Sequence, residues 1–398
     1  MSKVIRGYKY RIYPTEEQAE RINGLIHYTR FAYNWAVEKE YKLYEQYKLG
    51  NSEYGFYSYI DLEKLFLEEL KINPKMQWIK DNNYPTSILK YTFMNLVNGF
   101  DRFFKGQNKG KPWFKSKKHC KKAFPVRYDR FYIKNNKVRF TGVGSYIDLG
   151  FDCGLNVSKV MNSTSISLDN LGNYYISFSL EEENEELEIP KSEGVGIDIG
   201  IRQTFVLSTG EIYNQPKEKL EKLEKKRRRQ QRRVTRDINR RKEIGRHTKT
   251  KYEDIPKSKR AIKREIKLLK TYRKIHNIKD TFYHNITKKI VDRNPEYVCM
   301  ETFGVTDIQT KRPYMNDKIV NVSFYDITRK MRYKCEKYNI PFISAPQEFP
   351  STQLCNNCGY KKDLHGNHVY KCPVCGMKMD RDINAAINLR NYGSQFIL

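Results

Sequence analysis

Two cysteine pairs near the C-terminal end constrain the fold of this chain more than any other feature. The pairs read Cys355-x2-Cys358 and Cys372-x2-Cys375, thirteen residues separate them, and a glycine directly follows each pair. Two such knuckles bring four thiolates within tetrahedral reach of one Zn²⁺ ion, and the glycine lets the backbone curl so that its amides face the sulfurs. Two disulfides are the alternative, but they suit a secreted protein better than a basic intracellular one. We therefore predict a zinc ribbon over residues 351–376 with one structural Zn²⁺.

The composition points to a polyanionic partner. Lysine and arginine number 75 against 46 aspartate and glutamate, so the formal net charge is +29 and the isoelectric point lies near 9.6. This excess favours nucleic acid as the partner. The chain also has 30 tyrosines, 20 phenylalanines and 3 tryptophans, which would suit a surface that stacks on bases, although any single ring is more simply explained as core. No stretch approaches the roughly 18 apolar residues of a membrane span, and the N-terminus lacks the apolar segment of a signal peptide, so we expect a cytoplasmic protein without a membrane partner.

The whole chain has 398 residues, which is enough for two or three folding units. Within its first half, the hydrophobic periodicity changes along the sequence and predicts separate segments. Residues 4–13 alternate as a strand does, and Thr15 is a candidate N-cap for the helix that follows. Apolar residues then recur at spacings of three and four, and short alternating runs come after them. This order predicts a small β-barrel (1–14 and 108–183) interrupted by a helical lobe (15–107). The acidic residues 184–193 are expected to form a linker.

Three acidic residues occupy positions that favour a metal site. Asp198 lies within the apolar run GVGIDIGIRQTFVLSTGEIY, which predicts a hairpin of two strands, and Glu301 ends a later apolar strand, EYVCMETF. A carboxylate in such a run is costly to bury unless a cation neutralises it. The third acid belongs to DRDINAAINL, where Asp382 is the candidate and Asp380 is an alternative that the spacing does not exclude. Structural explanations also remain open, since Asp198 suits a turn or an edge and Asp382 suits a helix N-cap.

A long basic stretch separates the first two acids. It predicts two helices, KEKLEKLEKKRRRQQRRVTRDINRRKE and SKRAIKREIKLLKTYRKIHNIKDTFYHNITKKIV. Such a charge run is often only a solvated face, but glutamates are too few here to balance it, so we expect nucleic-acid contact, with Arg227, Arg228 and Arg229 as candidates. The apolar face that we expect on the second helix consists of Ile262, Ile266, Leu269, Tyr272, Ile275, Phe282, Ile286 and Ile290.

The order of the three acids resembles the RuvC branch of the RNase H-like fold. More of the chain resembles TnpB, the family of RNA-guided DNA endonucleases that bacterial and archaeal insertion sequences encode. YRIYPTEEQ and YTRFAYNWAV are similar to the opening strand and helix of that family, and KGKPWFKSKKHCKKAF is similar to its mid-chain basic segment. GVGIDIGIRQTFVLSTG and VCMETFGV are similar to its first two nuclease motifs. The most specific match is the four-cysteine ribbon followed by DRDINAAINL, which is similar to the third motif.

The resemblance implies a multidomain α+β protein. A RuvC-like nuclease domain (194–350 and 377–398) would follow a wedge-like barrel and its recognition lobe, and the ribbon would be inserted within the nuclease domain. By the same resemblance, Asp198, Glu301 and Asp382 would be the catalytic residues and would hold two Mg²⁺ ions, or Mn²⁺, for phosphodiester hydrolysis.

The resemblance also implies the partners. They would be a guide RNA, a double-stranded DNA target with a short motif beside it, and the DNA strand that guide pairing displaces. We expect a monomer rather than a dimer, located in a prokaryotic cytoplasm and associated with the nucleoid when bound to DNA. Besides the arginines above, the residues expected to contact nucleic acid are Tyr57, Tyr59, Lys90, Lys115, Lys117 and Lys118.

Three other functions are compatible with parts of this pattern. A compact type V CRISPR effector would differ mainly in the origin of its guide. A nuclease-inactive guided repressor would bind DNA without cutting it, but the presence of all three acids argues against it. A transposase or resolvase that works without a guide would give strand-transfer products instead of simple breaks.

Overall fold

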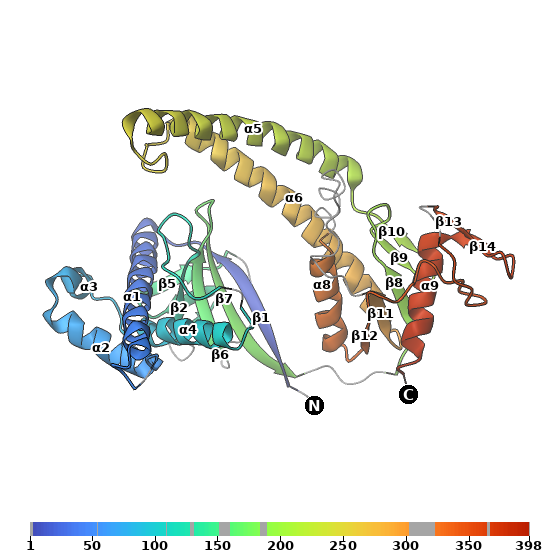
Figure 1. Cartoon of the computed structure of the whole chain (residues 1–398), viewed down its shortest axis with the longest axis horizontal. Helices are drawn as coiled ribbons and strands as arrows, with labels where there is room; N and C mark the ends of the chain where they lie inside the picture. The colour runs from blue at the N-terminus through green and yellow to red at the C-terminus, as the bar shows by residue number, and fades with distance from the viewer. Residues whose placement is uncertain are drawn as a thin grey trace. The chain divides into compact units, whose positions relative to one another are not determined.

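The computed structural model divides the chain into two compact units, Lys3–Glu182 and Glu183–Leu398, and each is described by itself (Figure 1). Part of the expected linker (184–188) and part of the expected nuclease domain (302–322) lie outside the residues that the structure describes. Within the described part of the chain, no helix has the length and low charge that crossing a bilayer requires. The described residues are 3–53, 55–108, 110–127, 131–150, 160–183, 189–301, 323–363 and 367–397.

The helices of the first unit begin where the sequence provides capping groups. Helix α1 starts after Thr15, whose side chain accepts a hydrogen bond from the Gln18 amide while the Gln18 side chain accepts one from the Thr15 amide. Ser58 and Asp61 form the same reciprocal cap at the start of α2. The helices, with one short 3₁₀ turn η1, are α1 (Glu16–Lys48), α2 (Tyr59–Ile72), η1 (Pro74–Met76), α3 (Gln77–Asp81) and α4 (Ser87–Phe104).

The strands of this unit form two sheets. One is four-stranded, in the order β1-β7-β6-β2, and the other is the antiparallel meander β3-β4-β5. A bridge between Tyr13 and Asp148 connects the end of β1 to β5. The expected barrel therefore stays a prediction, because these pairings describe two linked sheets. The strands are β1 (Lys3–Ile12), β2 (Lys122–Val126), β3 (Phe131–Lys134), β4 (Lys137–Phe140), β5 (Val143–Asp148), β6 (Val160–Leu168) and β7 (Tyr174–Glu183).

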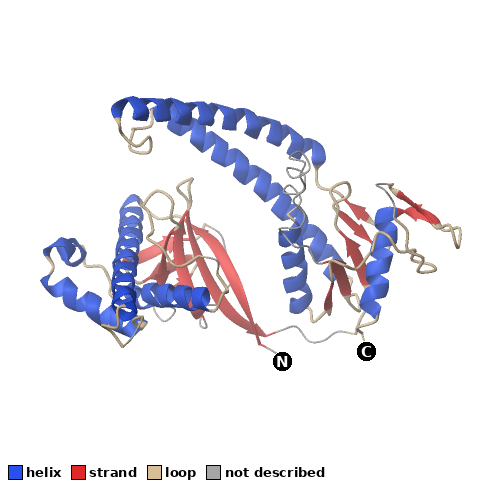
Figure 2. Cartoon of the chain, viewed as in Figure 1, coloured by secondary structure: helices blue, strands red, loops and turns tan. Residues whose placement is uncertain are grey.

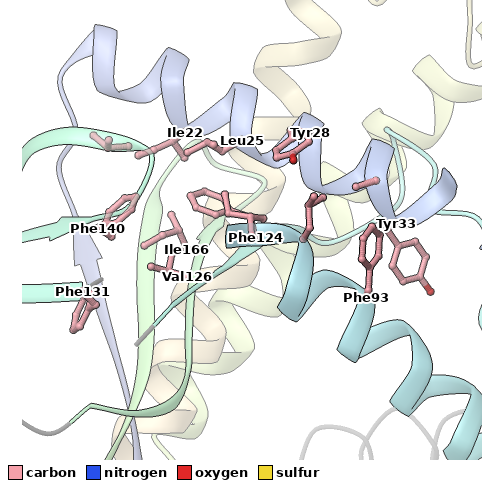
Figure 3. Close-up of a cluster of buried hydrophobic side chains, with 14 of the residues drawn as sticks. Ile22, Leu25, Tyr28, Tyr33, Phe93, Phe124, Val126, Phe131, Phe140 and Ile166 are labelled. Carbon is pink, nitrogen blue, oxygen red and sulfur yellow. The ribbon is translucent and has the colours of Figure 1, made fainter. Parts of the chain in front are cut away.

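One hydrophobic core joins the helices and sheets of the first unit. Ile22 and Leu25 on α1 point toward Phe124 on β2 and Phe140 on β4, and all four side chains are buried (Figure 3). The helical segment is thus packed directly on the strands, because its apolar face has no other surface to cover it.

The second unit is built on a mixed five-stranded sheet in the order β10-β9-β8-β11-β12. Strands β8, β9 and β10 are antiparallel neighbours, whereas β8, β11 and β12 run parallel. Helices cover both faces (Figure 2): α6 and α8 pack on one, and α9 packs on the other. The strands are β8 (Val195–Asp198), β9 (Phe205–Leu207), β10 (Ile212–Tyr213), β11 (Val298–Glu301) and β12 (Phe342–Ala345), and the helices α5 (Lys217–Thr248), α6 (Lys259–Val291), α8 (Phe324–Lys337) and α9 (Arg381–Ser394).

The basic stretch forms the long pair α5 and α6, which pack against each other (Figure 1). Ser258 caps α6 by accepting a hydrogen bond from the Ala261 amide. The expected apolar face of α6 is right in the C-terminal half, where Ile275 and Ile290 are buried, and wrong in the N-terminal half, where Ile262 and Ile266 are exposed. The residues buried in that half are Ala261, Leu268 and Thr271.

The part of the expected linker that the structure describes is attached to the second unit. The Lys191 amide donates to the Asn294 carbonyl, and the Asn294 side chain donates to the Ile189 carbonyl. Ser192 bridges to Pro295 as a short parallel extension of the sheet. Residues 189–193 thus lead directly into β8.

Candidate active site and cysteine cluster

The pleat of two strands places Asp198 and Glu301 on the same face of the sheet. Successive side chains on a strand point to opposite faces. In β8, Val195 and Ile197 belong to the core with α6 and α8, so Asp198 faces the opposite side, toward α9. In β11, Val298 and Met300 belong to that same core, so Glu301 also faces α9. Both acids stand at the ends of neighbouring parallel strands.

A glycine lets α9 approach this face closely. A Cβ on Gly196 would lie 2.0 Å from the Ala386 carbonyl oxygen and 2.4 Å from the Arg390 nitrogen, so no larger residue fits between β8 and α9. The absence of a side chain at this position brings the first turn of the helix beside Asp198. Asp382 lies in that turn and is 4% exposed.

The two aspartates of DRD have different roles in the structure. The Oδ1 atom of Asp380 accepts hydrogen bonds from the amides of Asp382 (2.9 Å) and Ile383 (3.3 Å), which makes Asp380 the N-cap of α9. The N-cap explanation considered for Asp382 therefore applies to Asp380. Asp382 is the more buried of the two and acts more strongly on Asp198.

The pKa values of Asp198 and Glu301 are raised above those of ordinary carboxyl groups. Burial, followed by the negative charges of Asp382 and Glu301, raises the pKa of Asp198 to about 7. Burial also raises the pKa of Glu301 to about 7, and a hydrogen bond from the Ser351 side chain opposes that shift. A buried and a half-buried acid with pKa values raised to about 7, beside a third carboxylate, are typical of a functional site.

Two arginines hold the Asp382 carboxylate. Arg202, in the turn after β8, donates from Nη2 to Asp380 Oδ2 (2.8 Å) and Asp382 Oδ2 (3.0 Å). Arg381 donates from Nε and Nη2 to Asp382 Oδ1 (2.9 and 2.8 Å). Neither arginine was predicted from the sequence, although Arg202 follows the first acid by four residues and Arg381 separates the two aspartates.

The donor chemistry of this cluster fits a divalent cation. Carboxylate oxygens are the ligands that Mg²⁺ and Mn²⁺ prefer, and a bound cation would favour the ionised forms of Asp198 and Glu301. The three acids do not meet as tightly as the cysteines do, because only the cysteines, among the described residues, form a group whose donor atoms all lie within 4.8 Å of one another. Asp382 and Glu301 are close enough to Asp198 to raise its pKa.

The four expected cysteines do come together. The Sγ atoms of Cys355 and Cys375 are 3.6 Å apart and those of Cys358 and Cys372 are 3.5 Å apart. Four sulfurs around one Zn²⁺ at about 2.3 Å would be about 3.8 Å from each other, so this cluster could bind the ion. The glycines after the pairs, Gly359 and Gly376, both have φ of +74°, a conformation that few other residues adopt.

A short hairpin mounts this cluster directly before α9. It consists of β13 (Val369–Lys371) and β14 (Lys378–Asp380), which are antiparallel. Tyr370 is buried against two of the cysteines and donates hydrogen bonds to the carbonyls of Gln353 and Tyr360. Because β14 ends at Asp380, the hairpin leads without a gap into the helix that carries Asp382.

The expected nucleic-acid contacts have mixed environments. Lys90 is exposed on α4 and its Nζ lies 6.0 Å from the centre of the Tyr59 ring, so these two side chains share one surface, with Tyr57 half-buried close by in sequence. Lys117 and Lys118 are exposed. Lys115 is half-buried, and its Nζ lies 3.4 Å from the centre of the Tyr33 ring.

The arginines of α5 also differ from one another. Arg228 and Arg229 are exposed. Arg227 instead forms an ion pair with Glu224 (2.6 Å) and donates to the Tyr272 hydroxyl on α6 (3.1 Å). Its guanidinium therefore joins the two helices rather than facing solvent.

An aromatic cavity in the first unit was not foreseen. It has a volume of about 220 Å³ and lies between the C-terminal parts of α1 and α4. Aromatic rings beside lysines can stack on unpaired bases. The side chains that line it are Tyr41, Tyr44, Lys48, Phe56, Phe100, Phe103, Phe104 and Lys111.

Three family models match separate parts of the chain. They are the TNB domain of Cas12f1-like proteins over residues 324–389, the helix-turn-helix domain of OrfB proteins of the IS605 type over 1–48, and a "Probable transposase" of the same OrfB type over 177–316. The chain belongs to the TnpB family. The name of the second model does not describe the structure, in which residues 3–48 form one strand and one helix of 33 residues.

Relatives match this TnpB protein over nearly its full length. One from Streptomyces pristinaespiralis, described as "Putative RNA-guided DNA endonuclease", is 24% identical over 98% of this chain and 89% of its own. InsQ of Escherichia coli K12, with the same description, is 24% identical over 97% of this chain and 92% of its own. The Cas12f1 endodeoxyribonuclease of Sulfoacidibacillus thermotolerans is 26% identical over 58% of this chain and 53% of its own.

A solved structure shares the fold. The chain of a Cas12f1 complex with guide RNA and target DNA aligns with a TM-score of 0.51 and 13% identity, covering 98% of this chain and 99% of that one. The TnpB protein is therefore a mixed α/β protein with the fold of that effector and a four-cysteine cluster.

Proposed function

We propose that this TnpB protein is an RNA-guided DNA endonuclease of an insertion sequence. The observation that carries the proposal is the meeting of Asp198, Glu301 and Asp382 on one face of a mixed sheet, directly after a four-cysteine hairpin. The descriptions of relatives that match the chain from end to end support the same function.

The nuclease unit is proposed to have a RuvC-like RNase H fold. Three antiparallel strands followed by two parallel ones, with the acids at the ends of β8 and β11 and on the first turn of α9, support it. Asp198, Glu301 and Asp382 are the residues that would hold two Mg²⁺ ions. When bound, the metal would supply an activated water and stabilise the leaving oxygen of a phosphodiester. Arg202 and Arg381 keep both oxygens of Asp382 oriented, and burial keeps bulk water away from Asp198.

The remaining parts supply binding. The four cysteines would hold one structural Zn²⁺. The exposed arginines of α5 and the surface of Tyr59 and Lys90 would contact the guide RNA, the target duplex and the displaced strand. We propose that the protein acts as a monomer in the cytoplasm, at the nucleoid when bound to DNA.

The test is Asp198→Ala in protein purified with its own guide RNA. We expect loss of DNA cleavage, while guide and target binding stay nearly unchanged because Asp198 is buried and is not among the residues proposed to contact nucleic acid. Cleavage at the wild-type rate would refute the assignment. Asp380→Asn is the matched control, since asparagine keeps the N-cap and should keep most of the activity.

A second candidate is a compact CRISPR effector, favoured by the fold shared with the Cas12f1 complex. Sequencing the RNA that copurifies with the protein separates the two. One RNA that overlaps or follows the 3′ end of the gene supports the insertion-sequence nuclease, whereas a repeat and spacer RNA supports the effector.

A further inference from the structure

Two buried asparagines on α9 have no part in the proposed chemistry. Asn384 and Asn388 belong to the motif DRDINAAINL, are separated by one helical turn and are 0% and 6% exposed. A buried carboxamide is unfavourable unless its hydrogen bonds are made, so these side chains need specific partners.

Their partners lie at the junction that leads into the first cysteine pair. Asn388 Nδ2 donates to the carbonyls of Ser351 and Leu354, both at 2.8 Å. Asn384 Nδ2 donates to the same Leu354 carbonyl (2.6 Å), and its Oδ1 accepts from the Asn356 amide (3.1 Å). We call these two asparagines and the backbone of residues 351–356 the asparagine clasp. Cys355 lies inside this segment, so the first knuckle is fastened to α9.

Ser351 links the asparagine clasp to Glu301, the second of the three acids in the sequence. Ser351 is 3% exposed, and while its carbonyl accepts from Asn388, its side chain donates a hydrogen bond to the Glu301 carboxylate. Asp382 lies six residues before Asn388 on the same helix. The carboxylates of Glu301 and Asp382 come from different elements, and the clasp is a direct hydrogen-bonded connection between those elements.

We propose that the asparagine clasp is a positioning device that makes the folded four-cysteine cluster part of the nuclease site. This inference rests on the proposed function. Metal loading of the four cysteines orders residues 351–356, which then hold Ser351 against Glu301 and fix α9 with Asp382. Metal in the hairpin therefore controls the rate of the chemical step. If the cysteine cluster served only to bind DNA, its metal would instead control target affinity and not the rate of the chemical step.

The test uses the full-length protein with its guide RNA. Asn388→Ala removes two donors from the clasp, and Ser351→Ala removes only the hydroxyl at Glu301. Asn391→Ala, an exposed asparagine on the same helix, is the matched control. Each variant is assayed for zinc content, melting temperature, target affinity, cleavage rate at saturating DNA, and Mn²⁺ affinity by electron paramagnetic resonance.

We expect Asn388→Ala and Ser351→Ala to lower the cleavage rate and the Mn²⁺ affinity about 10- to 100-fold, the usual effect of losing a group that orients a metal ligand. Target affinity should stay within about twofold of wild type in both, and Asn391→Ala should match wild type throughout. Removing zinc with a chelator should lower the wild-type cleavage rate in the same way.

Wild-type cleavage and Mn²⁺ affinity in both variants would overturn the proposal. If Asn388→Ala loses zinc or melts early, Ser351→Ala decides, because it leaves the backbone contacts of the hairpin intact. A wild-type complex that cuts no guided DNA would refute the proposed function instead, and the Mn²⁺ affinities would still report on the clasp.

Discussion

At the level of single residues, the candidate active site contains carboxyl groups whose ionisation is made unfavourable by burial. Asp198 is buried beside two other acids, and its pKa of about 7 measures how strongly the fold resists its ionisation. The fold tolerates it because the rest of the sheet is well packed and because Arg202 and Arg381 neutralise Asp382 nearby. The acids and the cysteines could be found from the sequence because each breaks a local pattern. The arginines and asparagines could not, since they look like ordinary helix and turn residues.

Gly196 tests how closely α9 must lie on the sheet. We expect Gly196→Ala to lower the unfolding free energy by about 2 kcal/mol or more, because the new methyl would meet backbone atoms that have no freedom to rotate away. Cleavage should fall as well, since relief of the clash moves Asp382 from Asp198. Chemical denaturation and a cleavage assay measure both effects. Gly144→Ala, where no atom lies within 4 Å of the added Cβ, should change neither.

Glu40 on α1 provides a pH test within the first unit. It is fully buried, its Oε2 accepts from the Tyr57 amide (3.1 Å), and burial raises its pKa from 4.5 to about 7. A raised pKa means that the folded state binds this proton more tightly than the unfolded state. Its contribution to stability is therefore complete below about pH 4.5 and is lost as the pH rises to about 7.

We expect Glu40→Gln, which imitates the protonated form, to raise the unfolding free energy at pH 8 by roughly 2 to 3 kcal/mol and to change it little at pH 4. Urea denaturation at the two pH values measures the difference. An equal effect of the substitution at both would contradict the burial of an ionising carboxylate at this position.

At the scale of elements, neighbours decide which face of a helix is buried. The period of α6 predicted an apolar face through Ile262, Ile266 and Ile275, but α5 packs on the side of Ala261 and Leu268 in the first half. The helix is long enough to meet different partners along its length, so one face cannot describe it. Thr15, in contrast, caps α1 as expected, because a cap depends only on residues close in sequence.

The arginines of α5 are expected to have two different roles. Arg229 is expected to bind nucleic acid, whereas Arg227 stabilises the packing of α5 on α6. Arg229→Ala should leave the melting temperature unchanged and reduce the salt dependence of nucleic-acid binding by about one unit of slope, as expected for one lost phosphate contact. Arg227→Ala should instead destabilise the pair by about 1 kcal/mol or less, because Arg227 bonds to Glu224 and Tyr272. Binding isotherms at several salt concentrations and thermal melts distinguish the two. If binding by Arg229→Ala and by wild type has the same salt dependence, Arg229 does not belong to the nucleic-acid-binding surface.

At the scale of the whole molecule, the chain consists of two units with separate cores. The expected barrel and helical lobe share one core in the first unit, and the five-stranded sheet, α9 and the cysteine hairpin are continuous in the second. We expect a fragment of residues 189–398 to fold alone and to bind one zinc. Chelation should lower its melting temperature by about 5 °C or more, while a fragment of residues 3–182 should not respond. Calorimetry of both fragments, with and without chelator, measures this. A chelator response in the fragment of residues 3–182 only would mean that the metal lies outside the cysteine cluster.

Features that depend on residues close together could be predicted from the sequence. These are the knuckle spacing with its glycines, the Thr15 cap of α1, the strands that carry Asp198 and Glu301, and the charge. The tertiary structure was needed to show that Asp380 rather than Asp382 caps α9, how closely α9 lies on Gly196, and that Asn384 and Asn388 fasten the first cysteine knuckle to that helix. Gly196 and the part of α9 that it meets are about 190 positions apart, and contacts over such separations leave no periodic trace in the sequence.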